Sequence, residues 1–140
     1  MAKGNEGKYI DKVHRQLSKF PQPVYRLKMN MGMGSPSGVP DYYYESGYSI
    51  LWSEYKVVED LTRMRKIPIK KLSPHQHNWL ERAARNNVNC SVIIGDTNGM
   101  GVFLFRNEIF SPPPLTRAII LNAQGIAEQI RTYTCGPLTR

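Results

Sequence analysis

Hydrophobic residues recur along the chain with two different periods, which separate predicted helices from predicted strands. Over residues 5–20, apolar side chains return every three or four positions, a spacing typical of an amphipathic helix. Pro21 and Pro23 end this helix. Short runs rich in β-branched and aromatic residues predict strands. These runs cover residues 24–31, 39–45, 48–58, 90–94 and 102–105.

A second helix begins near residue 73, where Ser73, Pro74 and Gln76 have the pattern of a capping box. The stretch 59–72 before it is expected to be a loop, or a short helix followed by a loop. The element order is therefore αβββαββ, followed by a C-terminal segment with some helical character at 115–132. This order predicts an α/β fold in which helices flank a sheet of mixed strand direction.

The length of 140 residues fits a single domain, 1–140, with a core at about 5–106 and a C-terminal extension at 107–140. No apolar run approaches the ~20 residues that span a bilayer, so no membrane association is expected. The N-terminus lacks the apolar stretch of a signal peptide, which predicts a cytoplasmic protein. Cys90 and Cys135 have no CxxC partner, which excludes zinc-ribbon and thioredoxin-type sites.

The charge of the chain favours a polyanionic partner. Nineteen Lys and Arg against eleven Asp and Glu give a net charge of +8, with a pI near 9.7. Such an excess suits nucleic acid, although a merely soluble basic protein has the same composition. The most basic stretch is expected to contact a DNA backbone, with a solvated loop as the alternative. Its cations are Arg63, Arg65, Lys66, Lys70 and Lys71.

The predicted hairpin brings two carboxylates and an ammonium group together. If its turn is centred between Gly47 and Tyr48, residues pair when their numbers sum to 95, as those of Asp41 and Glu54 do. Directly opposed residues of antiparallel strands share a face, with Cβ atoms ~5 Å apart. Lys56 lies two positions beyond Glu54 and so lies on that face too.

Two carboxylates at this distance repel each other unless a cation lies between them. Mg²⁺ is the expected cofactor, because it takes oxygen ligands and keeps waters for chemistry; Mn²⁺ is expected to substitute for it. Lys56 would orient a metal-activated water or stabilise charge developing on phosphate. The alternative is a surface salt bridge of Lys56 with Asp41 or Glu54, because short acidic-x-Lys matches are common.

Pro40-Asp41 followed by Glu54-x-Lys56 resembles the core motif of the PD-(D/E)xK nuclease superfamily. With the downstream Leu72-Ser73-Pro74-His75-Gln76, the chain most resembles VRR-Nuc domains and, next, Holliday junction resolvases. The resemblance runs to about residue 95 and implies a restriction-endonuclease-like fold. It implies that Asp41, Glu54 and the Tyr55 backbone carbonyl bind the metal, and that Lys56 is the catalytic lysine.

The resemblance also assigns roles to three residues outside the core motif. Glu6 corresponds to a glutamate of the first helix that joins the metal site, and it lies on the inward stripe of that helix; the alternative is a solvated residue in the first turn. Gln76 corresponds to a downstream catalytic glutamine, although the capping box alone explains it. Arg26 corresponds to a basic residue near the scissile phosphate, with simple surface charge as the alternative.

The remaining histidines and aromatics carry no expected chemistry. His75 and His77 point to different sides of a helix, which argues against zinc binding, and His14 is expected at the surface. The aromatic residues of the predicted hairpin are available to stack on unpaired bases, but packing in the sheet is the better interpretation. They are Tyr42, Tyr43, Tyr44, Tyr48 and Trp52.

The sequence thus predicts a Mg²⁺-dependent endodeoxyribonuclease for branched DNA, such as a four-way junction or a flap. One small domain favours recognition of DNA shape over base readout. Junction cleavage needs two symmetric cuts, so a homodimer is expected, in the host cytoplasm if the gene belongs to a phage. An interface could come from the tail, through Ile119, Ile120, Leu121 and Ile126. The alternatives are a non-catalytic DNA-binding module on a nuclease fold and a nucleotide phosphohydrolase.

Overall fold

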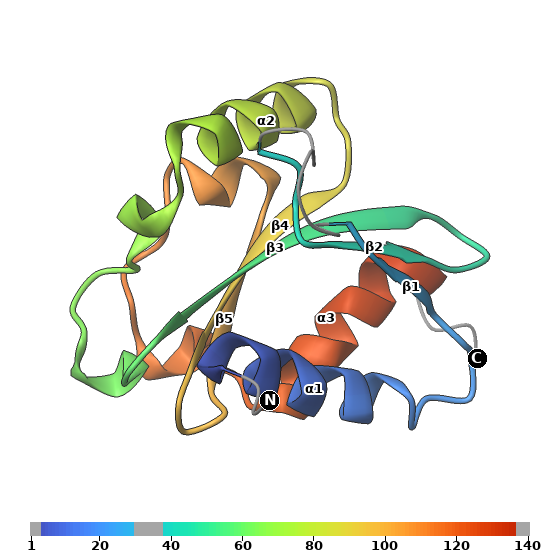
Figure 1. The fold of residues 1–140 in the computed structure, drawn as a ribbon, viewed down its shortest axis with the longest axis horizontal. Helices are drawn as coiled ribbons and strands as arrows, with labels where there is room; N and C mark the ends of the chain where they lie inside the picture. The colour runs from blue at the N-terminus through green and yellow to red at the C-terminus, as the bar shows by residue number, and fades with distance from the viewer. Residues whose placement is uncertain (1–3, 30–37, 137–140) are drawn as a thin grey trace.

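The strands form one sheet in the order β1-β2-β3-β4-β5 (Figure 1). The computed structural model describes residues 4–29 and 38–136, without the side chain of Lys70. The strands are β1 (Tyr25–Lys28), β2 (Tyr42–Glu45), β3 (Ile50–Val58), β4 (Cys90–Asp96) and β5 (Gly101–Phe105). The α-helices are α1 (Asn5–Leu17), α2 (Pro74–Arg85) and α3 (Ala123–Cys135). Four 3-10 turns complete the elements: η1 (Leu61–Arg63), η2 (Ile69–Lys71), η3 (Arg106–Ile109) and η4 (Arg117–Ile119).

The sheet is mixed, as the sequence predicts. The β1–β2, β2–β3 and β4–β5 pairs are antiparallel, whereas β3 and β4 are parallel. A parallel pair needs a crossover, and α2 provides it between β3 and β4. The predicted order αβββαββ is therefore confirmed, and the C-terminal segment contributes α3.

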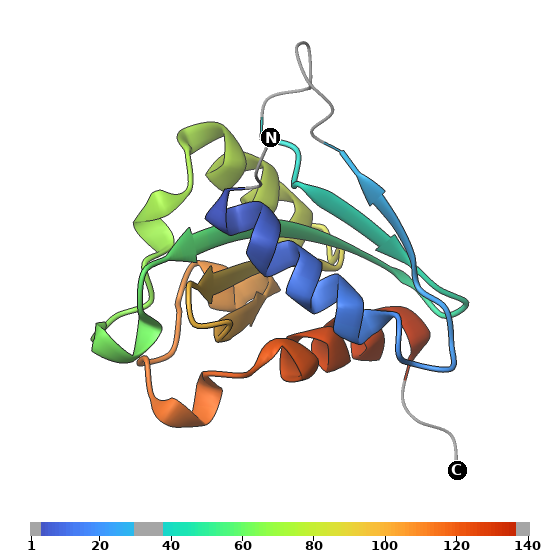
Figure 2. The same ribbon diagram turned by 60° about the horizontal axis from the view of Figure 1, so that its bottom comes forward.

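Helices cover both faces of the sheet. Figure 1 shows α2 above the long strands β3 and β4, with α1 and α3 below them, and in Figure 2 α1 crosses in front of β3. One hydrophobic cluster joins α2 and η3 to the sheet, and a second joins α1 and α3 to its other face. Every residue of β4 is buried, because this strand is covered on both faces. In the described part of the chain, no helix is both long and apolar enough to cross a bilayer.

The C-terminal segment belongs to the core. Asn122 caps α3 by accepting a hydrogen bond from the Gly125 N–H (2.8 Å), so this glycine lies in the first turn rather than interrupting the helix. Leu121 forms a β-bridge with Gly101, and Ile126 is fully buried. The predicted dimer interface is therefore wrong for Ile126, whose side chain packs inside its own chain. Ile119, Ile120 and Leu121 also pack against the two core clusters.

His14 is buried, which contradicts its predicted surface position. Only 7% of the residue is exposed, and its Nε2 lies 2.7 Å from the Tyr44 hydroxyl, which in turn lies 2.6 Å from the Tyr55 hydroxyl. The stripe of Ile10, Val13 and Leu17 underestimates the buried arc of α1, because the ring of His14 packs edge-on against Tyr42 and Tyr44 of β2. Hydrogen bonding offsets the cost of burying these polar groups.

Candidate active site

The β2–β3 ladder brings Asp41 beside β3. Its paired residues, from Tyr42 with Ser53 to Glu45 with Ile50, have numbers that sum to 95, which confirms the predicted register. Asp41 lies one residue before β2, and its Oδ2 accepts a hydrogen bond from the Tyr55 N–H (3.0 Å). The Asp41 carboxylate is therefore held at the end of the ladder by the backbone of the neighbouring strand.

Glu54 lies at the centre of a cluster of polar groups. Glu54 is only 2% exposed. Its Oε2 lies 3.5 Å from the Lys56 Nζ and also accepts a hydrogen bond from the Gln76 Nε2 (3.0 Å). The other oxygen, Oε1, is buried and has no described N–H or O–H donor, and the Asp41 carboxyl is close enough to share a hydrogen bond with Glu54 when Glu54 is protonated. We call Asp41, Glu54, Tyr55, Lys56 and Gln76 the carboxylate site. The lone Oε1 is an acceptor to which a cation or a donor would bind favourably.

The surroundings of Glu54 favour its neutral form. Burial raises the pKa of the Glu54 carboxyl to about 8, the charge of Asp41 acts in the same direction, and the Lys56 ammonium opposes both. A carboxyl perturbed in this way is typical of functional sites, because desolvation and like charges are tolerated where chemistry needs them. A bound cation would reverse the effect by stabilising the carboxylate.

A divalent ion would find a suitable donor set here. Extending the register by two positions puts Pro40 opposite Tyr55, and a proline has no N–H to donate to the Tyr55 carbonyl. Within 4–29 and 38–136, no three His, Cys, Asp or Glu side chains form a metal-binding group. The candidate ligands are instead two carboxylates, those of Asp41 and Glu54, together with the Tyr55 carbonyl that Pro40 leaves without a donor. Mg²⁺ is commonly bound by one or two carboxylates and keeps several waters, so these residues fit it.

Gln76 has two roles at once. Its Oε1 accepts from the Ser73 N–H (2.9 Å) while Ser73 Oγ accepts from the Gln76 N–H (3.2 Å), so the predicted capping box is present. Because the amide oxygen is engaged with Ser73, the amide nitrogen is directed at Glu54. The helix cap therefore sets the orientation of a group that holds the buried carboxylate.

The two roles of Gln76 are separable by mutation. Gln76→Ala and Ser73→Ala both break the capping box and should each lower the unfolding free energy by about 1 kcal/mol. Only Gln76→Ala also removes the hydrogen bond to Glu54, so only it should lower Mg²⁺ affinity or kcat further, by roughly 10–100-fold. Thermal unfolding and cleavage kinetics of both variants measure the difference. Equal kinetic losses would mean that Gln76 acts through the helix alone.

Glu6 lies at the rim of the carboxylate site rather than inside it. Its side chain is exposed in the first turn of α1, which contradicts the predicted inward position. Partial burial raises the pKa of the Glu6 carboxyl, Asp41 raises it further, and Lys56 and Lys28 lower it. The buried face of α1 begins at Tyr9, and Glu6 instead lines a cavity beside Lys56 of β3.

Lys28 is a neighbour of the site that sequence reasoning passed over in favour of Arg26. Lys28 lines a cavity of about 300 Å³ together with Asp41 and Glu6. Arg26 lies two residues before Lys28 in β1 and is exposed. The β1–β2 register pairs Lys28 with Tyr42, the residue that follows Asp41, and the β2–β3 hairpin from which the sequence argument started does not fix this register.

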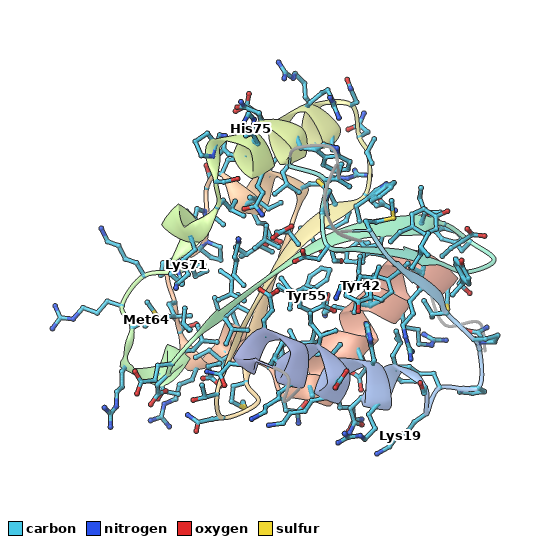
Figure 3. The ribbon with its side chains drawn as sticks, viewed as in Figure 1. Lys19, Tyr42, Tyr55, Met64, Lys71 and His75 are labelled. Atoms are coloured by element: carbon cyan, nitrogen blue, oxygen red, sulfur yellow. The ribbon has the colours of Figure 1, made fainter. Side chains whose placement is uncertain are left out.

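Two adjoining cavities form a groove beside the carboxylate site, and only some cations of the basic stretch 63–71 line it. A cavity of about 750 Å³ is lined by Glu6, Lys56 and Lys71, and an adjoining one of about 530 Å³ by Lys71 and Arg63. Arg65 and Lys66 line a different cavity, and the Lys70 side chain lies outside the described residues. Figure 3 labels Lys71 and Met64 on the same side of the molecule, away from Tyr42 and Tyr55.

The fold is similar to that of a solved resolvase. No family model matches the chain, and no curated protein matches it. Hjc, a Holliday junction resolvase from the archaeal hyperthermophile Archaeoglobus fulgidus, aligns with a TM-score of 0.54 and 15% identity. The alignment covers 86% of this chain and 98% of that chain. The chain has a resolvase-like fold. The fold class predicted from the resemblance to PD-(D/E)xK nucleases is therefore confirmed.

The other sequence expectations fit the resolvase-like fold as packing residues. His75 and His77 are exposed on α2, and the ring of His77 packs edge-on against Phe110. Trp52 packs between Tyr43 and Trp79, with ring centroids 5.1 and 5.4 Å away. Cys90 is fully buried, and burial raises the pKa of its thiol to about 11. Packing in the sheet accounts for Trp52, whereas the same prediction is wrong for Tyr48, which is 69% exposed in the turn between β2 and β3.

Gly38 fixes the approach to Asp41 in this fold. Its φ is +86°, and a Cβ there would overlap the backbone carbonyl of His75 at the start of α2. Gly38→Ala should lower the unfolding free energy by more than the ~1 kcal/mol of an unfavourable φ alone, and it should also reduce activity. Gly47→Ala is the matched control, because nothing lies within 4 Å of its Cβ position. Equal melting temperatures for the two variants would contradict the close approach.

Proposed function

We propose that this protein is a Mg²⁺-dependent endonuclease that hydrolyses phosphodiester bonds in branched DNA, such as a four-way junction or a flap. One observation carries the proposal: the Glu54 carboxylate is buried beside Asp41 with one oxygen unpartnered, and Lys56 and Gln76 hold the other oxygen. Structure alone does not require such an arrangement, because an unpaired buried acceptor costs about 1–3 kcal/mol. The resolvase-like fold and the net charge of +8 agree with a DNA substrate.

The chemistry would divide among the residues of the carboxylate site. A Mg²⁺ ion held by Asp41, Glu54 and the Tyr55 carbonyl would supply a water of lowered pKa and neutralise charge on the phosphate. Lys56, 21% exposed at its side chain, would contact the scissile phosphate and stabilise its growing negative charge. Gln76 would keep Glu54 in place. Glu6 and Lys28, at the rim, would position a bound water and an adjacent phosphate.

The groove beyond Lys56 would carry the phosphate next to the cut. Lys71 lines both of its cavities, so Lys71→Ala should weaken junction binding and reduce the slope of log K against log salt by about one unit. Lys19→Ala is the control, because Lys19 is exposed just after the C-terminal end of α1, far from Lys71 (Figure 3). Binding titrations at several salt concentrations measure both slopes. If the two variants behave alike, the groove is not the DNA path.

A cleavage assay tests the proposed function. Labelled four-way junction, flap, linear duplex and single-stranded DNA are incubated with Mg²⁺, with Mn²⁺ or with EDTA. We expect cleavage of the branched substrates with either metal ion and none with EDTA. A homodimer is part of the proposal, because a junction is resolved by two symmetric cuts, and sedimentation of the junction complex measures its stoichiometry. Binding without cleavage of any substrate would instead favour the non-catalytic DNA-binding module.

A further inference from the structure

A second concave surface lies between the 63–69 segment and the triple proline 112–114. It encloses about 1100 Å³ and is lined by Met64, Ile67, Pro68 and Ile69 on one wall and residues 112–114 on the other. We call it the proline groove. Its volume slightly exceeds the ~300–1,000 Å³ of small-molecule pockets, which is enough for several apolar side chains.

The floor of the proline groove is anchored in the core. Ile67 is 6% exposed, and Met64 and Ile69 pack against the α2-side hydrophobic cluster. The Ile69 N–H donates a hydrogen bond to the Ile67 carbonyl (2.8 Å), which fixes the turn between them. Pro68 and the three prolines opposite restrict the backbone further. A groove that exists before binding costs little to organise when a ligand arrives.

Every charged side chain among the described residues that line the proline groove is a cation. Arg65 and Lys66 are exposed at its rim. Arg63 also lines the groove that leads from the carboxylate site past Lys71, called the nuclease groove below, and it lies 3.4 Å from Asp60. Arg65 and Lys66 do not line the cavities that lead from the carboxylate site. Arg65 and Lys66 therefore border an apolar surface, and a DNA strand bound at Glu54 would not use them as phosphate contacts.

The chemistry of the proline groove selects among anionic ligands. Nucleic acid would need aromatic platforms for its bases, and none of the described lining residues is aromatic. An anionic bilayer is flat and contacts protruding surfaces, whereas this surface is concave. A peptide offers apolar side chains for the floor and carboxylates for the rim in one short segment. Apolar anchors in a preformed pocket with charges at the edge are the usual anatomy of such an interface.

We propose that the proline groove binds a short segment of a partner protein in which aliphatic or aromatic residues alternate with Asp or Glu. The apolar side chains enter between Met64 and residues 112–114, and the carboxylates pair with Arg65 and Lys66. The proposal is independent of the nuclease function, because it uses none of the residues of the carboxylate site. It would bring the protein to an acidic partner while the nuclease groove remains open.

Selection from a library of short random peptides tests the proposal. The full-length protein is the bait, and enriched peptides are synthesised and titrated by fluorescence anisotropy. We expect enriched sequences to combine Asp or Glu with Leu, Ile, Met or Phe. Binding should weaken by at least about tenfold with Arg65→Glu/Lys66→Glu and with Met64→Lys. The control Arg15→Glu/Lys19→Glu makes the same charge change at two exposed positions, one in α1 and one just after it, and should leave binding intact.

Three results would overturn the proposal. The first is a selection that enriches no acidic-apolar sequence. The second is an equal loss of binding in the α1 control, which would show that only net charge matters. The third is tighter binding to vesicles of mixed phosphatidylglycerol and phosphatidylcholine than to any selected peptide, which would make the surface a membrane contact. Circular dichroism of each variant shows that the fold is retained.

Discussion

Asp41→Asn and Glu54→Gln should each reduce Mg²⁺-dependent cleavage of a four-way junction by at least about 10³-fold, which corresponds to ~4 kcal/mol of transition-state stabilisation. Each change removes a charge that would hold the metal and keeps the shape of the side chain. Asp41 is held by the Tyr55 N–H and Glu54 by Gln76, so neither amide should disturb the sheet. Single-turnover kinetics at saturating enzyme measure the chemical step directly.

The expected loss of cleavage is specific to the carboxylate site. Glu128→Gln makes the same chemical change at an exposed position of α3 and should leave the rate unchanged. DNA binding by Asp41→Asn should persist, because removing a carboxylate from a phosphate-binding surface weakens repulsion. Cleavage by Glu54→Gln at the rate of the unmodified protein would contradict the proposed role of the carboxylate pair.

The second large effect is on stability in the absence of metal. Between about pH 5 and pH 8, the unfolding free energy of the protein in EDTA should fall as the pH rises. The pKa of Glu54 is about 8 in the folded protein and has its ordinary value of 4.5 when unfolded, so the folded state binds an extra proton in this range. The upper limit of the change is on the order of 5 kcal/mol, at ~1.4 kcal/mol for each pH unit between the two values.

Glu54→Gln isolates this effect, because its amide cannot ionise. At pH 8 in EDTA, the variant should melt above the unmodified protein, by about 3 °C for each kcal/mol recovered. Added Mg²⁺ should stabilise the unmodified protein and leave the variant nearly unchanged. Metal binding would release the proton of Glu54, so Mg²⁺ affinity should rise with pH over the same range. Identical melting profiles in EDTA at every pH would show that Glu54 is not buried as described.

The local part of the site is predictable from sequence. The position of a two-residue break, Ser46-Gly47, sets the hairpin register, and that register alone places Asp41 opposite Glu54 and Lys56 on the face of Glu54. The cap pattern of Ser73 and Gln76 is equally local and is confirmed in the structure. These inferences succeed because strand pairing and helix capping depend on residues close together in the chain.

The parts that sequence did not predict depend on packing between distant segments. His14 is buried because Tyr42 and Tyr44 of β2 pack against its side of α1, and Tyr44 lies 30 residues later in the chain. Glu6 is exposed because it lines an open cavity next to Lys56 and Val57 of β3 instead of packing against them. The basic stretch contributes to two grooves, since the chain turns at η1 and η2 and directs Lys71 and Arg65 to different cavities. The spacing of hydrophobic residues predicts which face of a helix or strand is buried, but it does not predict which other segments cover the remaining faces.

The proposed role of the carboxylate site gives a reason why the protein retains a buried Glu54 that lowers its stability. Glu54 lies in the middle of β3, between Ser53 and Tyr55, both fully buried, and it has no fully compensating partner. A hydrophobic residue there would extend the α2-side core and stabilise the protein. Natural proteins tolerate such local destabilisation mainly where it serves binding or catalysis. The carboxylate site is the strongest example of this among the described residues.

Anomalous diffraction from a crystal grown with Mn²⁺ tests the central claim most directly, because it locates the ion without relying on activity. We expect one anomalous peak within ~2–2.5 Å of the Asp41 and Glu54 carboxylates and the Tyr55 carbonyl, the range of metal–oxygen bonds. The peak should be lost in Glu54→Gln crystals. No anomalous peak at these oxygens, with the Asp41 and Glu54 carboxyl oxygens within hydrogen-bond distance of each other in the Mn²⁺ crystal, would contradict the account.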